Sequence, residues 1–136
     1  MNRLNFNLNP RSHVPIWEQI VHQMKEMVMK EIFSPQDKIP SVRELSSQLV
    51  INPNTVSKAY QELERQGVIE TIRGKGTFVA ERSVEVQFSE QQAEKLRDEL
   101  KRTIIEASYI GIESDMILQW TKELLDEFGG EPNAKR

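Results

Sequence analysis

The fold of this chain is decided by residues 40–67, which read PSVRELSSQLVINPNTVSKAYQELERQG. Ser41 and Glu44 have the Ser-x-x-Glu spacing of a capping box, a pattern that predicts the first turn of a helix. The apolar residues after this start recur at three- and four-residue spacing; they are Val42, Leu45 and Leu49. We therefore expect a short helix that buries one face.

The rest of this stretch predicts a turn and a longer helix. Asn52-Pro53-Asn54 favours a turn, and Gly67 supplies the left-handed conformation that ends many helices. Between them the apolar residues again follow helical spacing; they are Val56, Ala59, Tyr60 and Leu63. The stretch thus predicts two amphipathic helices joined by a tight turn.

An earlier helix precedes this pair. Pro15 suits its first turn, and Ser34-Pro35 breaks the pattern after an expected end near Ile32. The apolar stripe of this helix is Ile16, Ile20, Met24, Met27 and Val28. A third amphipathic helix is therefore expected at the front of the chain.

A hairpin follows the helices. The β-branched residues of 68–72 and 77–79 flank Arg73-Gly74-Lys75-Gly76, which predicts two strands joined by a tight turn. Helices separated by a turn and followed by a hairpin make a winged helix-turn-helix. We expect it to occupy residues 1–82.

Two more helices are expected in the last third of the chain. Ser89 and Gln92 repeat the capping-box spacing after a polar connection at residues 81–87, and Gly111 ends the first helix. Its apolar stripe is Ala93, Leu96, Leu100, Ile104 and Ala107. Ser114 is expected to cap the second helix, whose apolar face carries Ile117, Trp120, Thr121, Leu124 and Phe128.

Gly129-Gly130 is expected to stop the last helix, and residues 131–136 to fray because they have nothing apolar to bury. The predicted fold class is mainly α with a small β-hairpin: a winged helix-turn-helix followed by a two-helix dimerisation module at residues 83–136.

The two C-terminal helices carry more apolar residues than they can bury against each other. The same helices of a second copy would cover the surplus in a small symmetric bundle. The residues expected at this homodimer interface are Leu96, Leu100, Ile104, Ile117, Trp120, Leu124 and Phe128. Folding back onto the winged helix of the same chain is the alternative.

Tyr109, Met116 and Trp120 suit an adaptable pocket for a small-molecule effector, and they equally suit an ordinary core. The ligand of such a pocket is not predicted.

Composition limits the classes of protein. The chain has no cysteine, and no stretch approaches the roughly 18 consecutive apolar residues of a membrane span. A soluble, cytoplasmic protein without a signal peptide or membrane partner is expected. Residues 1–83 carry 11 Lys/Arg and 9 Asp/Glu, whereas residues 84–136 carry 7 and 12. This split suits a nucleic-acid-binding front and an acidic module held away from phosphate.

The second helix of a helix-turn-helix presents its first turn to base edges in the major groove. Arg43 lies where the preceding helix crosses the DNA backbone, although it could instead pair with Glu44 or Asp37. The glycine and cations of the hairpin suit close approach to phosphate, although they equally suit a plain turn. The predicted contacts with double-stranded DNA are Arg43, Asn52, Asn54, Thr55, Ser57, Lys58, Gln61, Arg73, Gly74 and Lys75.

No enzyme chemistry is predicted. The only histidines, His13 and His22, have no carboxylate cluster at ligand spacing, so neither a metal site nor a His-based catalytic pair is indicated. We expect no catalytic residue, metal or cofactor.

Three motifs together resemble the GntR family of regulators. They are Lys38-Ile39-Pro40-Ser41-Val42-Arg43-Glu44-Leu45, then Asn54-Thr55-Val56-Ser57-Lys58-Ala59-Tyr60, then Gly74-Lys75-Gly76-Thr77-Phe78-Val79. Pro15 to Ile20 fits as well, so the resemblance covers residues 10–80 in order. The chain departs from the family at Glu31 and Gln36, where glycines are common, and a different loop path is expected there.

The short two-helix tail resembles the YtrA-like subfamily, because about 50 residues cannot hold the larger effector domains of other subfamilies. The resemblance implies a homodimer that represses an operon, often one encoding an ABC transporter. Two joined recognition helices, spaced about one DNA turn apart, imply a palindromic operator. The alternative from another class is a winged helix that serves as a protein-interaction module.

Overall fold

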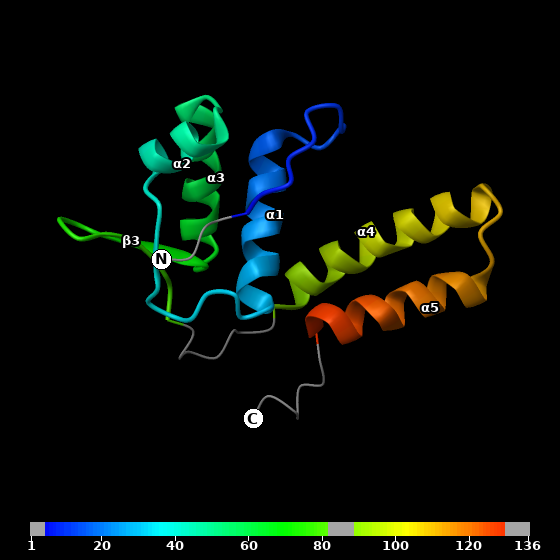
Figure 1. The fold of residues 1–136 in the computed structure, drawn as a ribbon. Helices are drawn as coiled ribbons and strands as arrows, with labels where there is room; N and C mark the ends of the chain where they lie inside the picture. Colours follow the sequence, from blue (N-terminus) through cyan, green and yellow to red (C-terminus); the bar gives the residue numbers. More distant parts are fainter. Residues whose placement is uncertain (1–4, 82–88, 130–136) are drawn as a thin grey trace. The chain divides into compact units, whose positions relative to one another are not determined.

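The computed structural model describes residues 5–81 and 89–129. The chain divides into two compact units, Met1–Ser83 and Val84–Arg136. Figure 1 shows the elements of each unit in chain order. The predicted frayed end at residues 131–136 and, apart from Glu81, the predicted polar connection lie outside the described residues.

The helices of the first unit lie where the apolar spacing predicts them. They are α1 (Ile16–Met29), α2 (Val42–Leu49) and α3 (Pro53–Arg65). Helix α3 is central, because it packs against both α1 and α2. The helical residues that form the core are Ile20, Val21, Met24, Met27, Leu45, Val56, Ala59, Tyr60 and Leu63.

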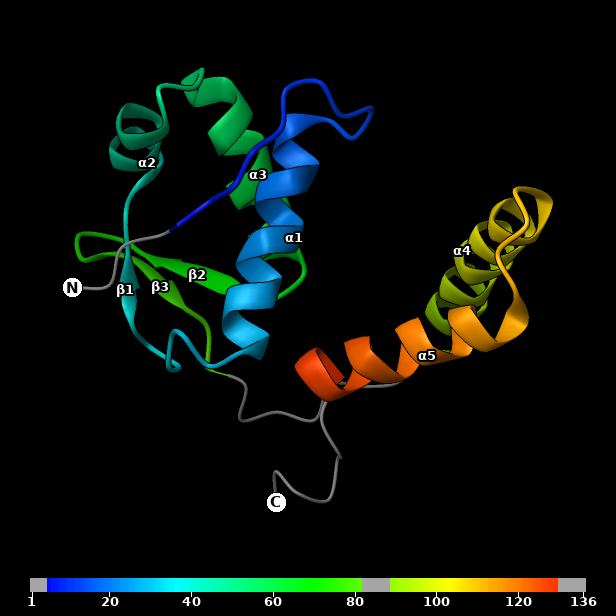
Figure 2. The ribbon, with the colours of Figure 1, turned by 45° about the vertical axis from the view of Figure 1, so that its right-hand side comes forward.

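A three-stranded antiparallel sheet completes the first unit. Its strands β1 (Lys38–Ile39), β3 (Gly76–Val79) and β2 (Ile69–Ile72) lie side by side in that order (Figure 2). The predicted hairpin and the winged helix-turn-helix fold are confirmed. Strand β1 was not predicted, because two residues are too short to show alternation. Ile39 and Val79 are buried core residues, so the sheet packs against the core of this unit.

Helix α1 ends at Met29, so the predicted end near Ile32 was three residues too late. Glu31 turns left-handed at a φ of 60°, and its N–H donates to the Val28 carbonyl at 3.0 Å. The Ile32 N–H donates to the Met27 carbonyl at 2.9 Å. This pair of bonds is a Schellman motif, which closes a helix and usually has glycine at the left-handed position.

Gln36 is also left-handed, with a φ of 71°. Both departures from the family glycines, Glu31 and Gln36, therefore adopt a backbone conformation that glycine reaches without strain.

An extended arm before α1 runs along that helix. The Gln23 side-chain amide accepts from the Asn7 N–H and donates to the Asn7 carbonyl, both at 2.8 Å. Gln19 pairs with Asn9 in the same way, at 2.8 and 2.9 Å. Two residues of extended chain and four of helix both advance about 6–7 Å, so the spacings match. The arm residues packed against the core are Phe6 and Leu8.

The second unit consists of α4 (Glu90–Tyr109), α5 (Ser114–Leu124) and the π-helical turn η1 (Leu125–Gly129). The Ser89 hydroxyl accepts a hydrogen bond from the Gln92 N–H at 3.3 Å, which is one half of the predicted capping box. After α4, Gly111 has the expected left-handed φ, at 92°.

Two details of the second unit differ from the prediction. Glu113, not Ser114, is the N-cap of α5, and Ser114 is the first helical residue. The α-helix stops at Leu124, so Phe128 lies in the π-helical turn and not in a continuous helix. Gly130 lies outside the described residues, and none of the described helices is both long and apolar enough to cross a membrane.

Candidate nucleic-acid interface

Hydrogen bonds at both helix starts fix the helix-turn-helix. The Glu44 N–H donates to Ser41 Oγ at 3.1 Å and the Ser41 N–H donates to Glu44 Oε1 at 2.9 Å, so the predicted capping box is present. Asn52 caps α3, where its Oδ1 accepts from the Asn54 N–H at 2.8 Å, and Pro53 follows at the first helical position. The predicted turn residues are therefore the cap and first turn of α3.

The N-terminal part of α3, residues 54–61, shows the division into polar and apolar sides that the sequence predicts. Val56 and Ala59 are completely buried, whereas Asn54, Lys58 and Gln61 are exposed. The other two predicted contacts of this helix, Thr55 and Ser57, are half-buried. The Ser57 hydroxyl accepts a hydrogen bond from the Gln61 side-chain amide at 3.5 Å, so two of the predicted contacts are neighbours on this side of the helix.

Lys58 has a partner that the sequence did not indicate. Its Nζ lies 4.6 Å from the centre of the Trp17 ring, which belongs to α1. A cation over an indole face is held by the ring quadrupole, with a strength of roughly 0.5–1 kcal/mol at an exposed site. The ammonium is therefore drawn toward the α1 side of α3.

Tyr60 joins α3 to the segment before α2. Its hydroxyl donates to the Pro40 carbonyl at 2.6 Å in a buried environment. Burial raises the pKa of the Tyr60 phenol, and the nearby Glu44 carboxylate adds to the increase. The sequence predicts Tyr60 only as a core residue, because apolar spacing carries no information about its hydroxyl.

Arg43 is exposed on the first turn of α2. Within the described residues it forms no ion pair, so the alternative pairing with Glu44 or Asp37 is not present. Glu44 bonds Ser41 instead, and Asp37 Oδ2 accepts from the Ser34 N–H at 2.8 Å. The Arg43 guanidinium is thus available to a ligand.

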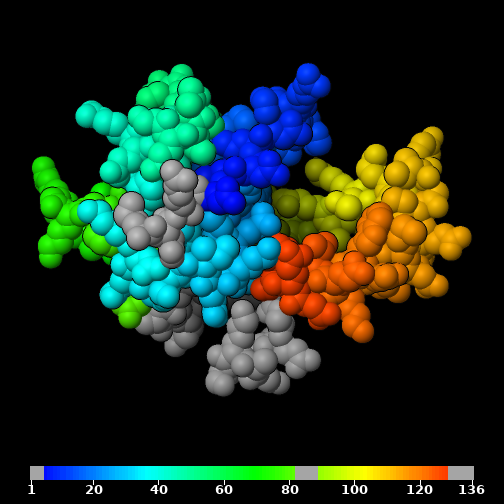
Figure 3. Space-filling view, viewed as in Figure 1, coloured from blue at the N-terminus to red at the C-terminus, as the bar shows by residue number. Residues whose placement is uncertain are grey.

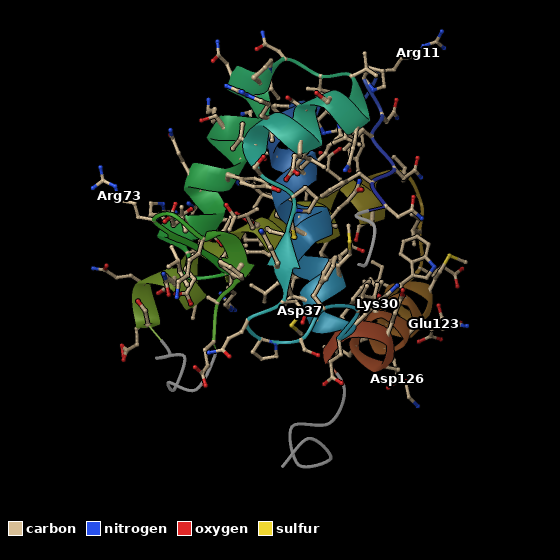
Figure 4. All side chains as sticks on the ribbon, turned by 60° about the vertical axis from the view of Figure 1, so that its left-hand side comes forward. Arg11, Lys30, Asp37, Arg73, Glu123 and Asp126 are labelled. Atoms are coloured by element: carbon tan, nitrogen blue, oxygen red, sulfur yellow. The ribbon has the colours of Figure 1, made fainter. Side chains whose placement is uncertain are left out.

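The hairpin forms a projecting wing. The Lys75 N–H donates to the Ile72 carbonyl at 2.9 Å across a turn in which Gly74 has a φ of 81°. Positive φ at this position is what a glycine allows. Arg73, Gly74 and Lys75 are all exposed, and the wing stands out from the body of the first unit (Figure 3). The Arg73 side chain extends away from it into solvent (Figure 4).

The structure also places near the wing a cation that is not among the predicted DNA contacts. The Lys38 side chain passes over Gly76, the residue directly after the wing turn. Lys38 belongs to β1, and because that strand was not predicted, no sequence signal placed its side chain at the wing.

Among the described residues, no group of His, Cys, Asp or Glu side chains could hold a metal ion.

A family model described as bacterial regulatory proteins, gntR family, matches residues 16–79. The HTH-type transcriptional repressor YtrA of Bacillus subtilis (strain 168) is 48% identical over 127 residues, which are 93% of this chain and 97% of that protein. The chain belongs to the GntR family.

Solved structures agree with this GntR assignment. The crystal structure of a transcriptional antiterminator from Listeria monocytogenes EGD-e has a TM-score of 0.84 and 43% identity, covering 96% of this chain and 97% of that one. YtrA from Sulfolobus acidocaldarius, a GntR-family transcription factor, has a TM-score of 0.53 and 31% identity, covering 90% and 97%. The resemblance to the YtrA-like subfamily is confirmed.

Membership of the GntR family makes the protein a DNA-binding transcriptional regulator, not an enzyme.

Proposed function

We propose that the protein is a homodimeric repressor that reads a palindromic operator with α3. In this proposal residues 1–82 are the DNA-binding domain and residues 83–136 the dimerisation domain. The observation that carries it is a contrast between the two units. The first unit exposes polar side chains on α2, α3 and the wing, whereas the second exposes large apolar side chains on α4 and α5. The repressor YtrA of Bacillus subtilis, similar over nearly the whole chain, supports it.

The proposed division of labour follows from the chemistry of each element. Asn54, Ser57 and Gln61 on α3 can exchange hydrogen bonds with base edges, and Lys58 can reach a guanine or a phosphate. Asn52 and Thr55 border them at the start of the helix. Arg43, Arg73 and Lys75 are cations suited to phosphate, with Gly74 allowing close approach of the wing. The cations set affinity, and the α3 side chains set sequence preference.

Dimerisation is supported by what the second unit leaves uncovered. Leu96 is 65% exposed and Leu118 67%, and the proposed interface residues Leu100, Ile104, Trp120 and Leu124 are exposed as well. The other two proposed interface residues, Ile117 and Phe128, are half-buried. Many exposed large apolar residues on two neighbouring helices are typical of a protein interface. Two joined copies of α3 would bind two half-sites about one DNA turn apart.

The regulated genes and the effector follow from the subfamily resemblance. We propose a cytoplasmic repressor of its own operon, one that encodes an ABC transporter. A small-molecule effector would bind near Tyr109, Met116 and Trp120; because all three are exposed in one copy, such a site needs the second copy to close it.

Fluorescence anisotropy with labelled duplexes that tile the promoter of the protein's own gene tests the proposal. We expect a tight complex at one palindrome, with two copies per duplex and an affinity that falls steeply with salt. Arg43→Ala and Arg73→Ala should weaken binding, and Asn54→Ala and Ser57→Ala should change sequence preference.

The protein-interaction alternative makes the opposite prediction. A wild-type protein that forms no salt-sensitive complex with any of the duplexes would favour it and remove the repressor proposal. If both α3 variants keep the DNA sequence preference of the wild type, another element must contact the bases.

A further inference from the structure

Lys38 lies on a strand that joins the two backbone-contacting elements of the proposed DNA interface. In the antiparallel register it is opposite Phe78 of β3, and its neighbour Ile39 is opposite Thr77. Alternate residues of a strand face opposite sides of the sheet. Because Ile39 and Thr77 are buried, Lys38 belongs to the outer side, where it is exposed.

Gly76 gives the Lys38 side chain its path toward the wing. A Cβ atom at position 76 would lie 2.9 Å from Lys38 Cε and 3.5 Å from Lys38 Nζ. The first distance is shorter than such atoms tolerate, so a side chain at position 76 would displace the flexible end of Lys38 from this course. Gly76 precedes Phe78 by two residues in the direction of the wing turn, and the Lys38 side chain therefore runs along β3 toward that turn.

The strand that carries Lys38 also leads directly into α2, whose N-cap Ser41 follows three residues later. The hydrogen bonds from the Ser41 backbone and side chain lower the pKa of Glu44, and the charge of Lys38 lowers it further. An interaction of this kind between solvated charges acts only at short range. Lys38 thus lies on the segment between the wing residue Gly76, over which its side chain passes, and the helix start that carries Arg43.

Glu44 provides a reason for a cation at this place. Its carboxylate closes the capping box, so the fold of α2 depends on it. A phosphate attracted to the neighbouring Arg43 would, however, be repelled by that carboxylate. A lysine beside Glu44 offsets this repulsion without disturbing the cap.

We propose that Lys38 is a phosphate-contacting residue between the wing and the start of α2, and that Gly76 leaves room for its side chain. This inference rests on the proposed DNA-binding function and adds a contact to it. A contact with phosphate fixes position and carries no base information. Lys38 should therefore strengthen binding to every duplex by a similar factor.

The test uses the full-length variant Lys38→Met, which keeps the apolar stem over Gly76 and removes the charge. Anisotropy titrations at several salt concentrations would use a promoter duplex and a mixed-sequence duplex. We expect binding roughly tenfold weaker at low salt on both, with a plot of log affinity against log salt shallower by about one unit. Lys38→Arg should restore the slope, and the matched control Lys101→Met on α4 should leave it unchanged.

A second substitution tests the role of the neighbouring carboxylate. Gln can replace Glu in a capping box, so Glu44→Gln removes the charge and retains the cap. It should tighten binding, and the gain should be larger when Lys38 is already Met. Equal gains in both backgrounds would contradict the shielding of Glu44.

The outcomes separate this inference from the function on which it rests. A wild-type salt slope in Lys38→Met, with the wild-type protein itself binding in a salt-sensitive way, overturns the role of Lys38 alone. Absence of any salt-sensitive complex for the wild-type protein overturns both.

Discussion

The two units of the chain use similar amphipathic helices in opposite ways. In the first unit, Ile20, Met24, Leu45, Val56 and Leu63 have no exposed surface. In the described part of the second unit, the one buried apolar side chain is Ala107, and its large apolar residues are mostly exposed. The first unit contains its own core, whereas the second leaves most of its large apolar residues uncovered, as the proposed interface requires.

Geometry explains the difference between the units. Three helices and a sheet enclose the apolar face of α3 from several sides. The second unit has only two helices, and on α5 the adjacent residues Ile117 and Leu118 point about 100° apart. A single neighbouring helix cannot cover both directions. An amphipathic helix is therefore no guarantee of a core within the same chain.

The largest expected effect comes from charging the exposed face of the second unit. Leu100→Glu should convert the proposed dimer into a monomer, because a carboxylate at an apolar interface lacks a partner. Loss of the second half-site contact should then weaken operator binding by roughly 100-fold or more. Analytical ultracentrifugation and anisotropy on the same samples would measure both.

Arg102→Glu is the matched control, since it also introduces a carboxylate on α4 but on the side away from Leu100. It should remain a dimer. A dimeric Leu100→Glu protein would remove the proposed interface.

A pair of leucine truncations sharpens the same contrast. Leu63→Ala opens a cavity in the core of the first unit and should lower the free energy of unfolding by about 2–5 kcal/mol at any protein concentration. Leu96→Ala should act through association, so its effect should vary with protein concentration. Denaturant unfolding followed by circular dichroism at two concentrations distinguishes them. A concentration-independent effect of Leu96→Ala would place this residue in a core of its own chain.

The apolar pattern could predict the helices and the hairpin because their signals are periodic and local. Capping residues such as Ser41 and glycines such as Gly67 and Gly111 marked the ends correctly, since their chemistry is specific to those positions. The α5 cap was missed by one residue because a serine followed Glu113 and fitted the capping pattern better.

Other features had no such signal. Strand β1 and the path of Lys38 depend on pairing with a segment about 40 residues later, and the Trp17–Lys58 contact depends on the packing of α1 against α3. Contacts between distant segments are set by tertiary structure, which single-residue patterns do not encode. The sequence could predict which elements carry the proposed DNA contacts. It could not predict the partners of Lys58 and Tyr60.

Tyr60→Phe tests how firmly the core of the first unit positions α3. Losing the donor leaves the buried Pro40 carbonyl without its partner and should cost about 1–2 kcal/mol of unfolding free energy. Because burial raises the pKa of this phenol, the folded state holds its proton above pH 10 while the unfolded state releases it. Stability should therefore fall as the pH rises above about 10, through the range up to the raised folded pKa.

Tyr60→Phe lacks this ionisation and should show a smaller alkaline loss in thermal unfolding from pH 8 to 11. Tyr109→Phe, at an exposed position, is the control. Equal alkaline slopes for Tyr60→Phe and the wild type would contradict the assignment.

The smallest expected effects concern the left-handed residues that end four helices. Glu31, Gly67 and Gly111 occupy the same position of Schellman motifs after α1, α3 and α4. Val50 is the left-handed C-cap of α2, where its own N–H and that of Ile51 both donate to the Ser46 carbonyl. Two of these four residues are not glycine, and both of these belong to the first unit. A unit with its own core can tolerate such strain, which for an L-residue is about 1–2 kcal/mol.

Glycine at the strained positions should stabilise the first unit. Val50 is 89% exposed, so Val50→Gly removes strain at φ 54° and loses no packing. After the greater entropy of the unfolded chain is subtracted, we expect a gain of about 0.5–1 kcal/mol. Gly67→Ala meets no atom within 4 Å, yet should lose about 1 kcal/mol because its φ is 76°. Opposite signs in denaturant unfolding would identify backbone strain as the cause, whereas a loss in both variants would show that Val50 stabilises the turn through its side chain.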